Sequence, residues 1–207
     1  MELLNNIWKS LVVILLLSIA TTTVAQENIL SAFKDSYVLE QKGDFVNAAE
    51  KLNKVYQADS YEINLRLGWL SYLAGKLSEA ESFYGKAISL KPYAIEPKLG
   101  LAFPLAAQAK WDELMTLYVK ILEIDPQNTL VNYRMGLIYY NRQNYEKADV
   151  YLEKVINLYP FDYDTLILLA WNKLSLGKTK EARVLFNKTL LYSPNDASAL
   201  EGLKLLK

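Results

Sequence analysis

The sequence contains neither cysteine nor histidine in its 207 residues. The absence of cysteine excludes disulfides, thiolate nucleophiles and attachment of a lipid through a thiol. The absence of histidine excludes the commonest acid–base pairs and nearly all zinc and copper sites. The Asp-x-Asp-x-Asp-Gly loop that holds calcium is missing as well. We therefore predict a protein that is not an enzyme, with no catalytic residues, no metal site and no cofactor.

A surplus of charge of either sign is also missing. Lysine and arginine number 23, aspartate and glutamate also number 23, and no long run of one sign occurs. A protein that neutralises nucleic-acid phosphates normally carries an excess of basic residues, so no nucleic-acid partner is expected. The hydrophobic fraction of 52% and the charged fraction of 22% are those of a globular protein.

The amino-terminal segment, residues 1–25, differs from the rest. The basic residue Lys9 is followed by the apolar run "LVVILLLSIA" and by small residues that lead to Ala25. This order is typical of a secretory signal peptide, with cleavage expected between Ala25 and Gln26. The alternative is an uncleaved membrane anchor, because the stretch from Ser10 to Gln26 carries no charge and its length reaches the lower limit for spanning a bilayer. With cleavage, we expect export to a bacterial periplasm or to the cell exterior.

The dominant pattern in the remaining sequence is a repeat with a constant period. The segment "GKLSEAESFYGKAISLKP" starts at Gly75, and related segments start at Ala109, Gln143 and Gly177, at equal spacing. A weaker copy starts at Gly43, slightly closer to the first than one full period. Apolar residues within each copy recur at spacings of three and four, which indicates an amphipathic helix, and the closing proline ends it where one is present.

A second helical stretch precedes each copy, for example over residues 61–74. Gly75 and Gly177, with Ala109 and Gln143 in the same place, mark a short turn between the two helices. The repeating unit is therefore helix, turn, helix.

Residues at fixed places in this unit resemble the signature of the tetratricopeptide repeat family. That signature contains Trp, Leu-Gly, Tyr, Ala, Phe and Pro at set spacings. One unit carries Leu67, Gly68, Ala80, Tyr84, Ala87 and Pro92 at these places, and another carries Met135, Gly136, Tyr139, Ala148, Leu152 and Pro160. The resemblance covers residues 28–207.

The resemblance implies an all-α fold, a right-handed α-solenoid of stacked antiparallel helix pairs. The repeats are expected at about residues 29–60, 61–94, 95–128, 129–162 and 163–196, with a capping helix over residues 197–207. Asn195 or Asp196 can cap the start of that last helix. Pro104 falls in the middle of a helix and should kink it, either as a tolerated bend or as a functional hinge.

In this family the first helices of successive pairs usually line a concave surface that binds a peptide or a helix. Residues four apart share one face of a helix, so the period selects the side chains of that surface. The predicted groove for a peptide or protein consists of Phe33, Tyr37, Leu65, Trp69, Tyr72, Leu99, Phe103, Tyr133, Leu137, Tyr140, Ile167 and Trp171. Arg66 and Arg134 would edge this groove and contact a carboxylate of the partner.

Residues 133–148 contain four tyrosines, and the same geometry divides them. Tyr139 and Tyr145 are expected in the core, where they close one helix on the other, and Tyr133 and Tyr140 in the groove. Two interpretations of the groove rings stay open. They either pack against one another on the inner face, or form an exposed trough of the kind that usually marks an interaction site.

We therefore expect an exported, non-enzymatic interaction module that binds a peptide or protein segment in its groove and serves a cell-envelope or secreted complex. One alternative is a scaffold that bridges or oligomerises envelope complexes through its convex side or its ends, and self-association fits that alternative. A second is an accessory subunit of an envelope enzyme. A membrane is expected as a partner only if the first segment is not cleaved.

Overall fold

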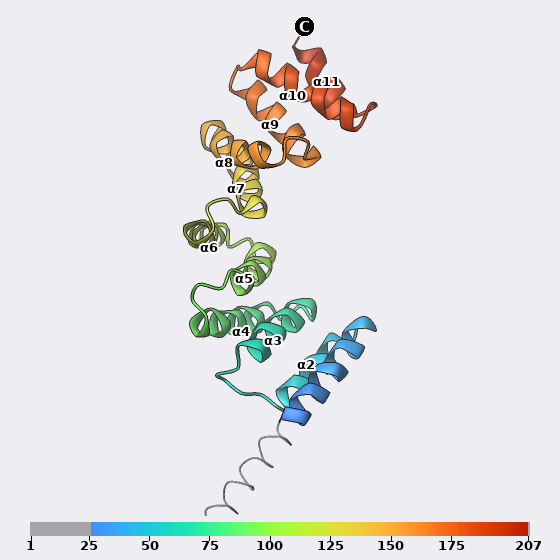
Figure 1. Ribbon diagram of the computed structural model, residues 1–207, viewed down its shortest axis with the longest axis vertical. Helices are drawn as coiled ribbons and strands as arrows, with labels where there is room; N and C mark the ends of the chain where they lie inside the picture. The colour runs from blue at the N-terminus through green and yellow to red at the C-terminus, as the bar shows by residue number, and fades with distance from the viewer. Residues whose placement is uncertain (1–25, 207) are drawn as a thin grey trace, which may run out of the picture. The chain divides into compact units, whose positions relative to one another are not determined.

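The computed structural model describes residues 26–206, and all regular structure among them is helical (Figure 1). Residues 26–41 are helical. The helices that follow are α2 Phe45–Asn53, α3 Tyr61–Leu73, α4 Leu77–Leu90, α5 Glu96–Ala107, α6 Trp111–Ile124, α7 Thr129–Asn141, α8 Tyr145–Leu158, α9 Tyr163–Ser175, α10 Thr179–Tyr192 and α11 Ala197–Leu205. The all-α fold predicted from the repeat is confirmed, and the predicted signal peptide or anchor lies outside the described residues.

Local signals in the sequence account for many of the helix ends. A capping side chain accepts a hydrogen bond from the backbone N–H three residues further on, which satisfies one of the free donors of a helix start. The caps of this kind are Asp44, Ser60, Asn128, Asn144, Asp162 and Asp196. The helices α4, α6, α8 and α10 each end two residues before a proline. Pro104, in contrast, lies inside α5, which continues to Ala107, and its role as a hinge stays a prediction.

The short turns between paired helices adopt the backbone conformation that glycine favours. Gly75 and Gly177 have φ angles of 75° and 72°, and Ala109 and Gln143, at the same place in their repeats, have φ angles of 55° and 56°. A residue with a Cβ atom is strained in this left-handed region. The prediction of a turn at these four positions is correct, and two of them carry strain that the glycines avoid.

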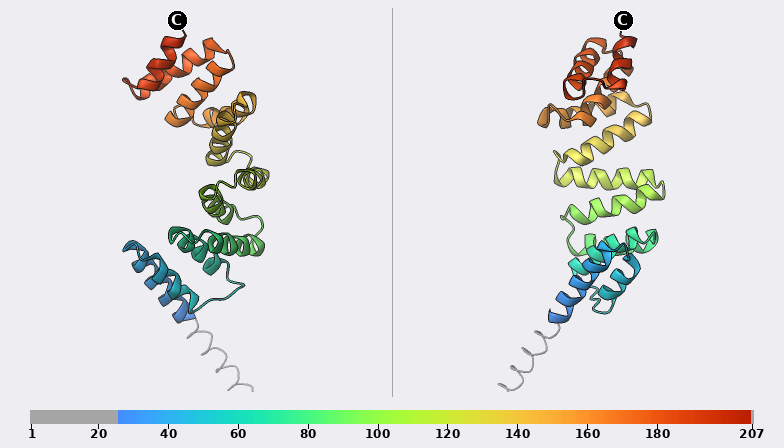
Figure 2. Two further views of the ribbon diagram at one scale, coloured as in Figure 1. Left: turned by 180° about the vertical axis from the view of Figure 1, so that it is seen from behind. Right: turned by 90° about the vertical axis from the view of Figure 1, so that its right-hand side faces the viewer.

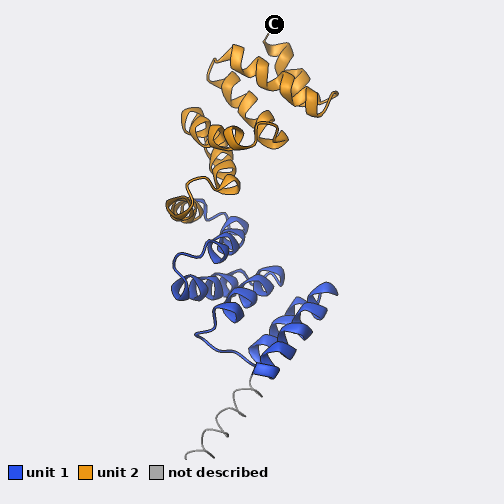
Figure 3. Ribbon diagram, in the orientation of Figure 1, with its two compact units in different colours: residues 1–111 blue, residues 112–207 orange. Residues whose placement is uncertain are grey.

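The chain divides into two compact units (Figure 3). Unit 1 extends to Trp111 and unit 2 starts at Asp112. In unit 1, α3 contacts α2, α4 and α5; in unit 2, α9 contacts α7, α8, α10 and α11. Consecutive helices of each unit therefore form stacked pairs (Figure 2). The first helices of neighbouring pairs, α3 with α5 and α7 with α9, also touch.

Each unit buries a continuous apolar core between its paired helices. In unit 1 the buried cluster consists of Ala32, Ala48, Leu52, Ile63, Leu67 and Leu70. In unit 2 the clusters consist of Ala148, Leu152, Ile156, Leu166 and Leu169, and of Ala170, Ala182, Phe186 and Ala199. Alanine recurs because neighbouring helices approach closely only where side chains are short, and the buried apolar area supplies most of the folding free energy.

Size complementarity links each pair of helices to the next pair. A Cβ atom at Gly100 would lie 2.2 Å from the Tyr84 ring, so the ring fits only because residue 100 is glycine. Two repeats later the same places carry Leu152 and Leu168, both smaller than a tyrosine ring. A large residue on one helix is thus matched by a small one on the next.

Candidate protein-binding surface

The predicted groove residues lie in two sets, one on each unit. Unit 1 carries Phe33, Tyr37, Leu65, Trp69, Tyr72, Leu99 and Phe103, and unit 2 carries Tyr133, Leu137, Tyr140, Ile167 and Trp171. Tyr37 is 49% exposed, and every other member is half-buried. Each set therefore keeps part of its apolar surface in solvent, and we call each the first-helix surface of its unit.

A pocket of about 380 Å³ lies on the first-helix surface of unit 1. It is lined by Phe33, Tyr37, Tyr61, Glu62, Leu65, Arg66, Trp69 and Glu96. Four predicted groove residues and Arg66 are thus brought together in one place. The two carboxylates come from the first turns of α3 and α5, where the positive end of the helix dipole favours an acidic side chain. The groove prediction did not include them.

Arg66 is held by partners within unit 1. Its guanidinium donates to Glu40, and its carbon Cζ lies 4.0 Å from the centre of the Tyr37 ring. The indole N–H of Trp69 donates to the other oxygen of Glu40 at 2.6 Å. The hydrogen bond from Arg66 lowers the pKa of Glu40, although burial opposes it, and the Trp69 bond lowers it further. Glu40 therefore stays charged and fixes both side chains.

A second cation belongs to the same region of unit 1. The ammonium of Lys91 lies 4.2 Å from the centre of the Tyr61 ring and 3.7 Å from Glu62 Oε1. The Tyr61 hydroxyl donates to Glu96 at 3.2 Å. Burial, and then the nearby charge of Glu96, raise the pKa of Tyr61 to about 12, so the phenol remains a donor at neutral pH. The carboxylates of this pocket thus have partners within the chain.

Three rings follow along the same surface. The ring centres of Trp69 and Tyr72 lie 5.8 Å apart, those of Tyr72 and Phe103 lie 5.3 Å apart, and those of Trp69 and Phe103 lie 5.9 Å apart. Aromatic pairs at such distances stabilise one another beyond their burial. The rings therefore pack against one another and remain half-exposed at the same time, which combines both interpretations of the sequence.

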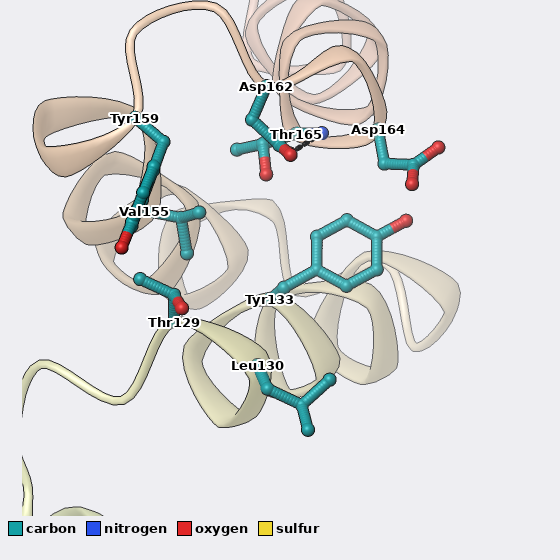
Figure 4. Close-up of a pocket in the computed structure, with 8 residues that line it drawn as sticks. All are labelled: Thr129, Leu130, Tyr133, Val155, Tyr159, Asp162, Asp164 and Thr165. Carbon is teal, nitrogen blue, oxygen red and sulfur yellow. Dashed lines mark hydrogen bonds between the residues drawn. The ribbon is translucent and has the colours of Figure 1, made fainter.

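A pocket on the first-helix surface of unit 2 has a volume of about 310 Å³ (Figure 4). It is lined by Thr129, Leu130, Tyr133, Val155, Tyr159, Asp162, Asp164 and Thr165. One predicted groove residue, Tyr133, belongs to it. Asp162 Oδ1 accepts the backbone N–H of Thr165 at 2.9 Å, which caps α9. Burial raises the pKa of Tyr133, and the charges of Asp164 and Asp162 raise it further, so both carboxylates act on this phenol.

Other predicted groove residues of unit 2 are anchored to its core. The Trp171 indole donates to Ser198 at 2.8 Å, and its ring meets Phe186 edge-on at 5.2 Å. Tyr140 meets Tyr145 edge-on at 5.6 Å. Tyr145, assigned to the core, thus contacts a ring assigned to the groove, and both side chains are half-buried. The division of the tyrosines into a core pair and a groove pair stays a prediction.

The remaining tyrosine of the core pair, Tyr139, stacks on Tyr151 of α8 at 5.6 Å, as expected for a residue that faces the partner helix. Arg134 donates to the Tyr118 hydroxyl at 3.0 Å. Both arginines suggested for a partner carboxylate, Arg66 and Arg134, are thus engaged inside the chain. Their contact with a partner stays a prediction.

Two functional features of the fold escaped the sequence analysis. The first is a set of hydrogen bonds that fixes the loop before α3, α5 and α7. The side chains of Asn64, Lys98 and Asn132 each donate to backbone carbonyls four and six residues earlier. The constant period of the repeat places all three in register, so the repeat itself was a signal for a shared role.

The second feature is a buried charge cluster in unit 2. The ammonium of Lys173 lies 2.9 Å from Asp149, 2.6 Å from Glu153 and 3.0 Å from Glu181. Burial alone would lower the pKa of Lys173, but hydrogen bonds to the three carboxylates raise it above its ordinary value. A single lysine in an otherwise regular helix gives no sequence signal for such a cluster, because its partners come from other helices.

Residues 26–206 contain neither a candidate metal site nor a candidate membrane span. No group of three or more acidic side chains in this part of the chain could hold a metal ion. No helix within it is both long and apolar enough to cross a bilayer.

Comparison with known proteins identifies the repeat in two segments. Residues 61–93 and residues 131–162 each match a model of the tetratricopeptide repeat. No curated protein matches the sequence significantly. These two matches fall in repeats that the sequence period had already located.

Several solved structures share the fold. A tetratricopeptide repeat protein from Parabacteroides merdae has a TM-score of 0.74 and 24% identity, and the alignment covers 87% of this chain and 72% of that one. YrrB, described as a tetratricopeptide repeat protein with an unusual peptide-binding site, has a TM-score of 0.69 and 14% identity over 88% and 97% of the chains. MamA from Desulfovibrio magneticus has a TM-score of 0.69 and 17% identity over 82% and 98%. At these identities the likeness establishes the fold.

Proposed function

We propose, from the premise that this chain belongs to the tetratricopeptide repeat family, that it is an exported, non-enzymatic module that binds a segment of a partner protein. The fold suggests a protein-interaction module. The observation that carries the proposal is the half-buried, largely aromatic first-helix surface of each unit, with a pocket in it. Apolar surface of this kind on a folded protein usually marks an interaction site.

Preorganisation supports binding at these surfaces. Glu40 holds the Trp69 indole, and Ser198 holds the Trp171 indole, through hydrogen bonds at 2.6 and 2.8 Å. A side chain that is already fixed loses little conformational entropy when a partner covers it. The two tryptophans therefore suit the role of anchors, the residue type that carries much of the binding free energy at interfaces.

Site-specific photo-crosslinking in cells tests the proposal. A photoreactive residue at Tyr37, which is 49% exposed at the unit 1 pocket, should capture a discrete protein partner. The matched control is Val184, which is 60% exposed on α10 and lines a different pocket of unit 2, away from the lining of both first-helix pockets. Equal capture at both positions, or capture at Val184 alone, would contradict binding at the first-helix surface.

Export is a separate part of the proposal. It rests on the order of basic residue, apolar run and small residues that ends at Ala25. Sequencing the amino terminus of the protein purified from its cell should give a chain that starts near Gln26. A chain that retains Trp8 would instead establish an anchor.

A scaffold that self-associates is the second candidate, and a patch on unit 2 favours it. Phe161, Leu191 and Tyr192 are 51%, 75% and 57% exposed, and the Phe161 and Tyr192 rings lie 5.5 Å apart. An exposed apolar patch of this kind is a candidate contact surface for a second copy of the chain or for a neighbouring complex. Sedimentation of the full chain should show a concentration-dependent oligomer that Leu191→Lys disrupts. A monomer at all concentrations would remove this candidate.

A further inference from the structure

The two pockets share four positions of the repeat, two repeats apart. Tyr61, Glu62, Leu65 and Glu96 of unit 1 correspond in register to Thr129, Leu130, Tyr133 and Asp164 of unit 2. In both pockets a carboxylate from the first turn of one first helix faces the preceding first helix. The rest of the lining comes from different helices and differs also in charge. Unit 1 adds Phe33, Tyr37, Arg66 and Trp69, and unit 2 adds Val155, Tyr159, Asp162 and Thr165.

Unit 1 fills this position with its own lysine. The ammonium of Lys91 lies over the Tyr61 ring at 4.2 Å and next to Glu62 at 3.7 Å. The residue that corresponds to Lys91 in unit 2 is Tyr159, which is 56% exposed and lines the pocket. The Tyr61 ring and Glu62, which Lys91 contacts, correspond to Thr129 and Leu130 in unit 2. The ring and the carboxylates of the unit 2 pocket are instead Tyr133, Asp162 and Asp164.

The two carboxylates of the unit 2 pocket belong to exposed residues and have no ion pair among the described residues, unlike several carboxylates elsewhere in the two units. Glu40, Glu81 and Asp149 each pair with a lysine or arginine. Within residues 26–206, no lysine or arginine lies within 4.0 Å of the carboxylates of Asp162 or Asp164. An acidic pocket lined by a tyrosine is attractive to a cation through both charge and the ring face.

A buried polar atom in the pocket points to a ligand independently. Thr165 is fully buried, and its hydroxyl oxygen has no hydrogen-bond partner among the described residues. Figure 4 shows this oxygen turned from α9 toward the space between Val155 and Tyr133. A buried hydroxyl without a partner costs free energy, and a ligand with N–H donors would remove that cost.

We propose that the unit 2 pocket binds a lysine side chain of the partner segment. The alkyl stem lies against Leu130, Val155 and the Tyr133 ring, and the ammonium donates toward Asp162 and Asp164 over the Thr165 hydroxyl. Like Lys91 in unit 1, this lysine would lie beside a tyrosine ring and a carboxylate, but these come from different positions of the repeat. This inference rests on the proposed function and adds the chemistry of the partner, a basic residue among apolar ones, where the sequence analysis had expected a carboxylate.

The first test uses n-butylammonium as a probe for the lysine side chain. Added to the purified full-length chain, it should shift the NMR methyl resonances of Thr165, Val155 and Leu130 with a saturable dependence on concentration. n-Butanol and butyrate, which have the same stem, should bind at least about tenfold more weakly. Equal shifts with butanol, tighter binding of n-butylguanidinium, or no saturable shift would each overturn the lysine assignment.

Three variants and one control sharpen this test. Asp162→Asn removes a charge and keeps a side chain that caps helices equally well, Asp164→Asn removes the second charge at an exposed position, and Thr165→Val removes the hydroxyl. The double Asp variant should weaken butylammonium binding about tenfold, and Thr165→Val should weaken it less. Glu146→Gln, at an exposed first-turn acid of α8, should change nothing. Unchanged binding in the double variant would overturn the proposal.

A second test separates this inference from the proposed function. A random peptide library displayed against the full-length chain should yield peptides with one shared lysine flanked by apolar residues. The preference for lysine should disappear with the double Asp variant. Peptides without any preference for lysine would leave the proposed function intact and overturn the inference. If no peptide is enriched, the proposed function itself fails.

Discussion

Units 1 and 2 both consist of stacked helix pairs, but they carry different side chains at equivalent positions of the repeat. In unit 1, Arg66 lines the pocket and pairs with Glu40, and Lys91, which is not a lining residue, pairs with Glu62 of the lining. In unit 2 the equivalent pocket contains Asp162 and Asp164 without a basic partner among the described residues. Four lining positions correspond, and the two pockets differ in the charged residues around them.

This difference teaches how a repeat protein acquires a binding site. The repeat needs its small and apolar residues for packing, and these recur in both units. The positions that line the first-helix surface are free of that requirement. A change such as lysine to tyrosine at the position shared by Lys91 and Tyr159 exposes a pocket and leaves the core unaltered. Four sets of substitutions test this comparison between units 1 and 2.

Exchanging the packing pair of unit 1 for that of unit 2 should have the largest effect. Gly100→Leu introduces a side chain where even a Cβ atom would lie 2.2 Å from the Tyr84 ring. We expect this overpacking to lower the free energy of unfolding by about 3 kcal/mol. Adding Tyr84→Leu recreates the Leu152 and Leu168 pair and should recover at least half of the loss. Urea unfolding followed by circular dichroism measures both, and a double variant no more stable than Gly100→Leu would refute the size matching.

Replacing the buried lysine of unit 2 by the residue of unit 1 should have the next largest effect. The position of Lys173 is occupied in unit 1 by Leu105, which is buried. Removing one partner of a fully buried ion pair costs about 3–5 kcal/mol. Lys173→Leu should cost about 2 kcal/mol, because Asp149 keeps Lys178 at 3.0 Å and the other carboxylates are partly in water. Urea unfolding at pH 7 measures the difference.

The cost of Lys173→Leu should depend on pH. Burial alone would raise the pKa of Asp149, but hydrogen bonds from Lys173 and Lys178 lower it below its ordinary 3.8. A carboxyl group with a lowered pKa stabilises the fold above its ordinary pKa and loses this contribution as the pH falls. The difference between the two proteins should therefore be full at pH 7 and shrink below about pH 4. A constant difference from pH 7 to pH 3 would contradict this origin.

Transferring the internal lysine between the units should move the binding site. Tyr159→Lys places in unit 2 the residue that Lys91 supplies in unit 1, and it should weaken n-butylammonium binding about tenfold through competition. Lys91→Gln should conversely allow the probe to shift resonances of the unit 1 pocket. Both positions are exposed, so stability should change by less than about 0.5 kcal/mol. Unchanged probe binding in Tyr159→Lys would show that the two positions are not equivalent.

Changing the residues at positive φ in the turns should have the smallest effect on stability. Both units contain turns with a glycine at positive φ and one turn with another residue at positive φ. The glycines are Gly43 and Gly75 in unit 1 and Gly177 in unit 2, and the other residues are Ala109 and Gln143. Gln143→Gly removes left-handed strain but adds flexibility to the unfolded chain, so we expect a gain of about 0.5 kcal/mol. Gly177→Ala, the matched control, should lose about 1 kcal/mol. Thermal unfolding compares them, and a loss of stability in Gln143→Gly would contradict the strain at this turn.

The repeat made most of the fold predictable. The spacing of apolar residues and the prolines located the paired helices, and the position of Gly75 located the turns. Less of the candidate site could be predicted from the sequence. Helical geometry selected surface side chains such as Leu65 and Trp69, but it could not show that Glu40 holds Arg66, because Glu40 lies on a different helix, far away in the sequence. Long-range ion pairs depend on how helices pack, and no local pattern encodes them.

The sequence by itself determined the architecture, since five related helix pairs with small residues at fixed places can bury their apolar faces only by stacking. It also determined the absence of histidine and cysteine chemistry. Tertiary structure alone decided which charges are neutralised. Lys91 and Glu62 meet across a turn and two helices, whereas Asp162 and Asp164 meet a tyrosine. The strength of a charge interaction depends on distances and burial, and only the packed units define these.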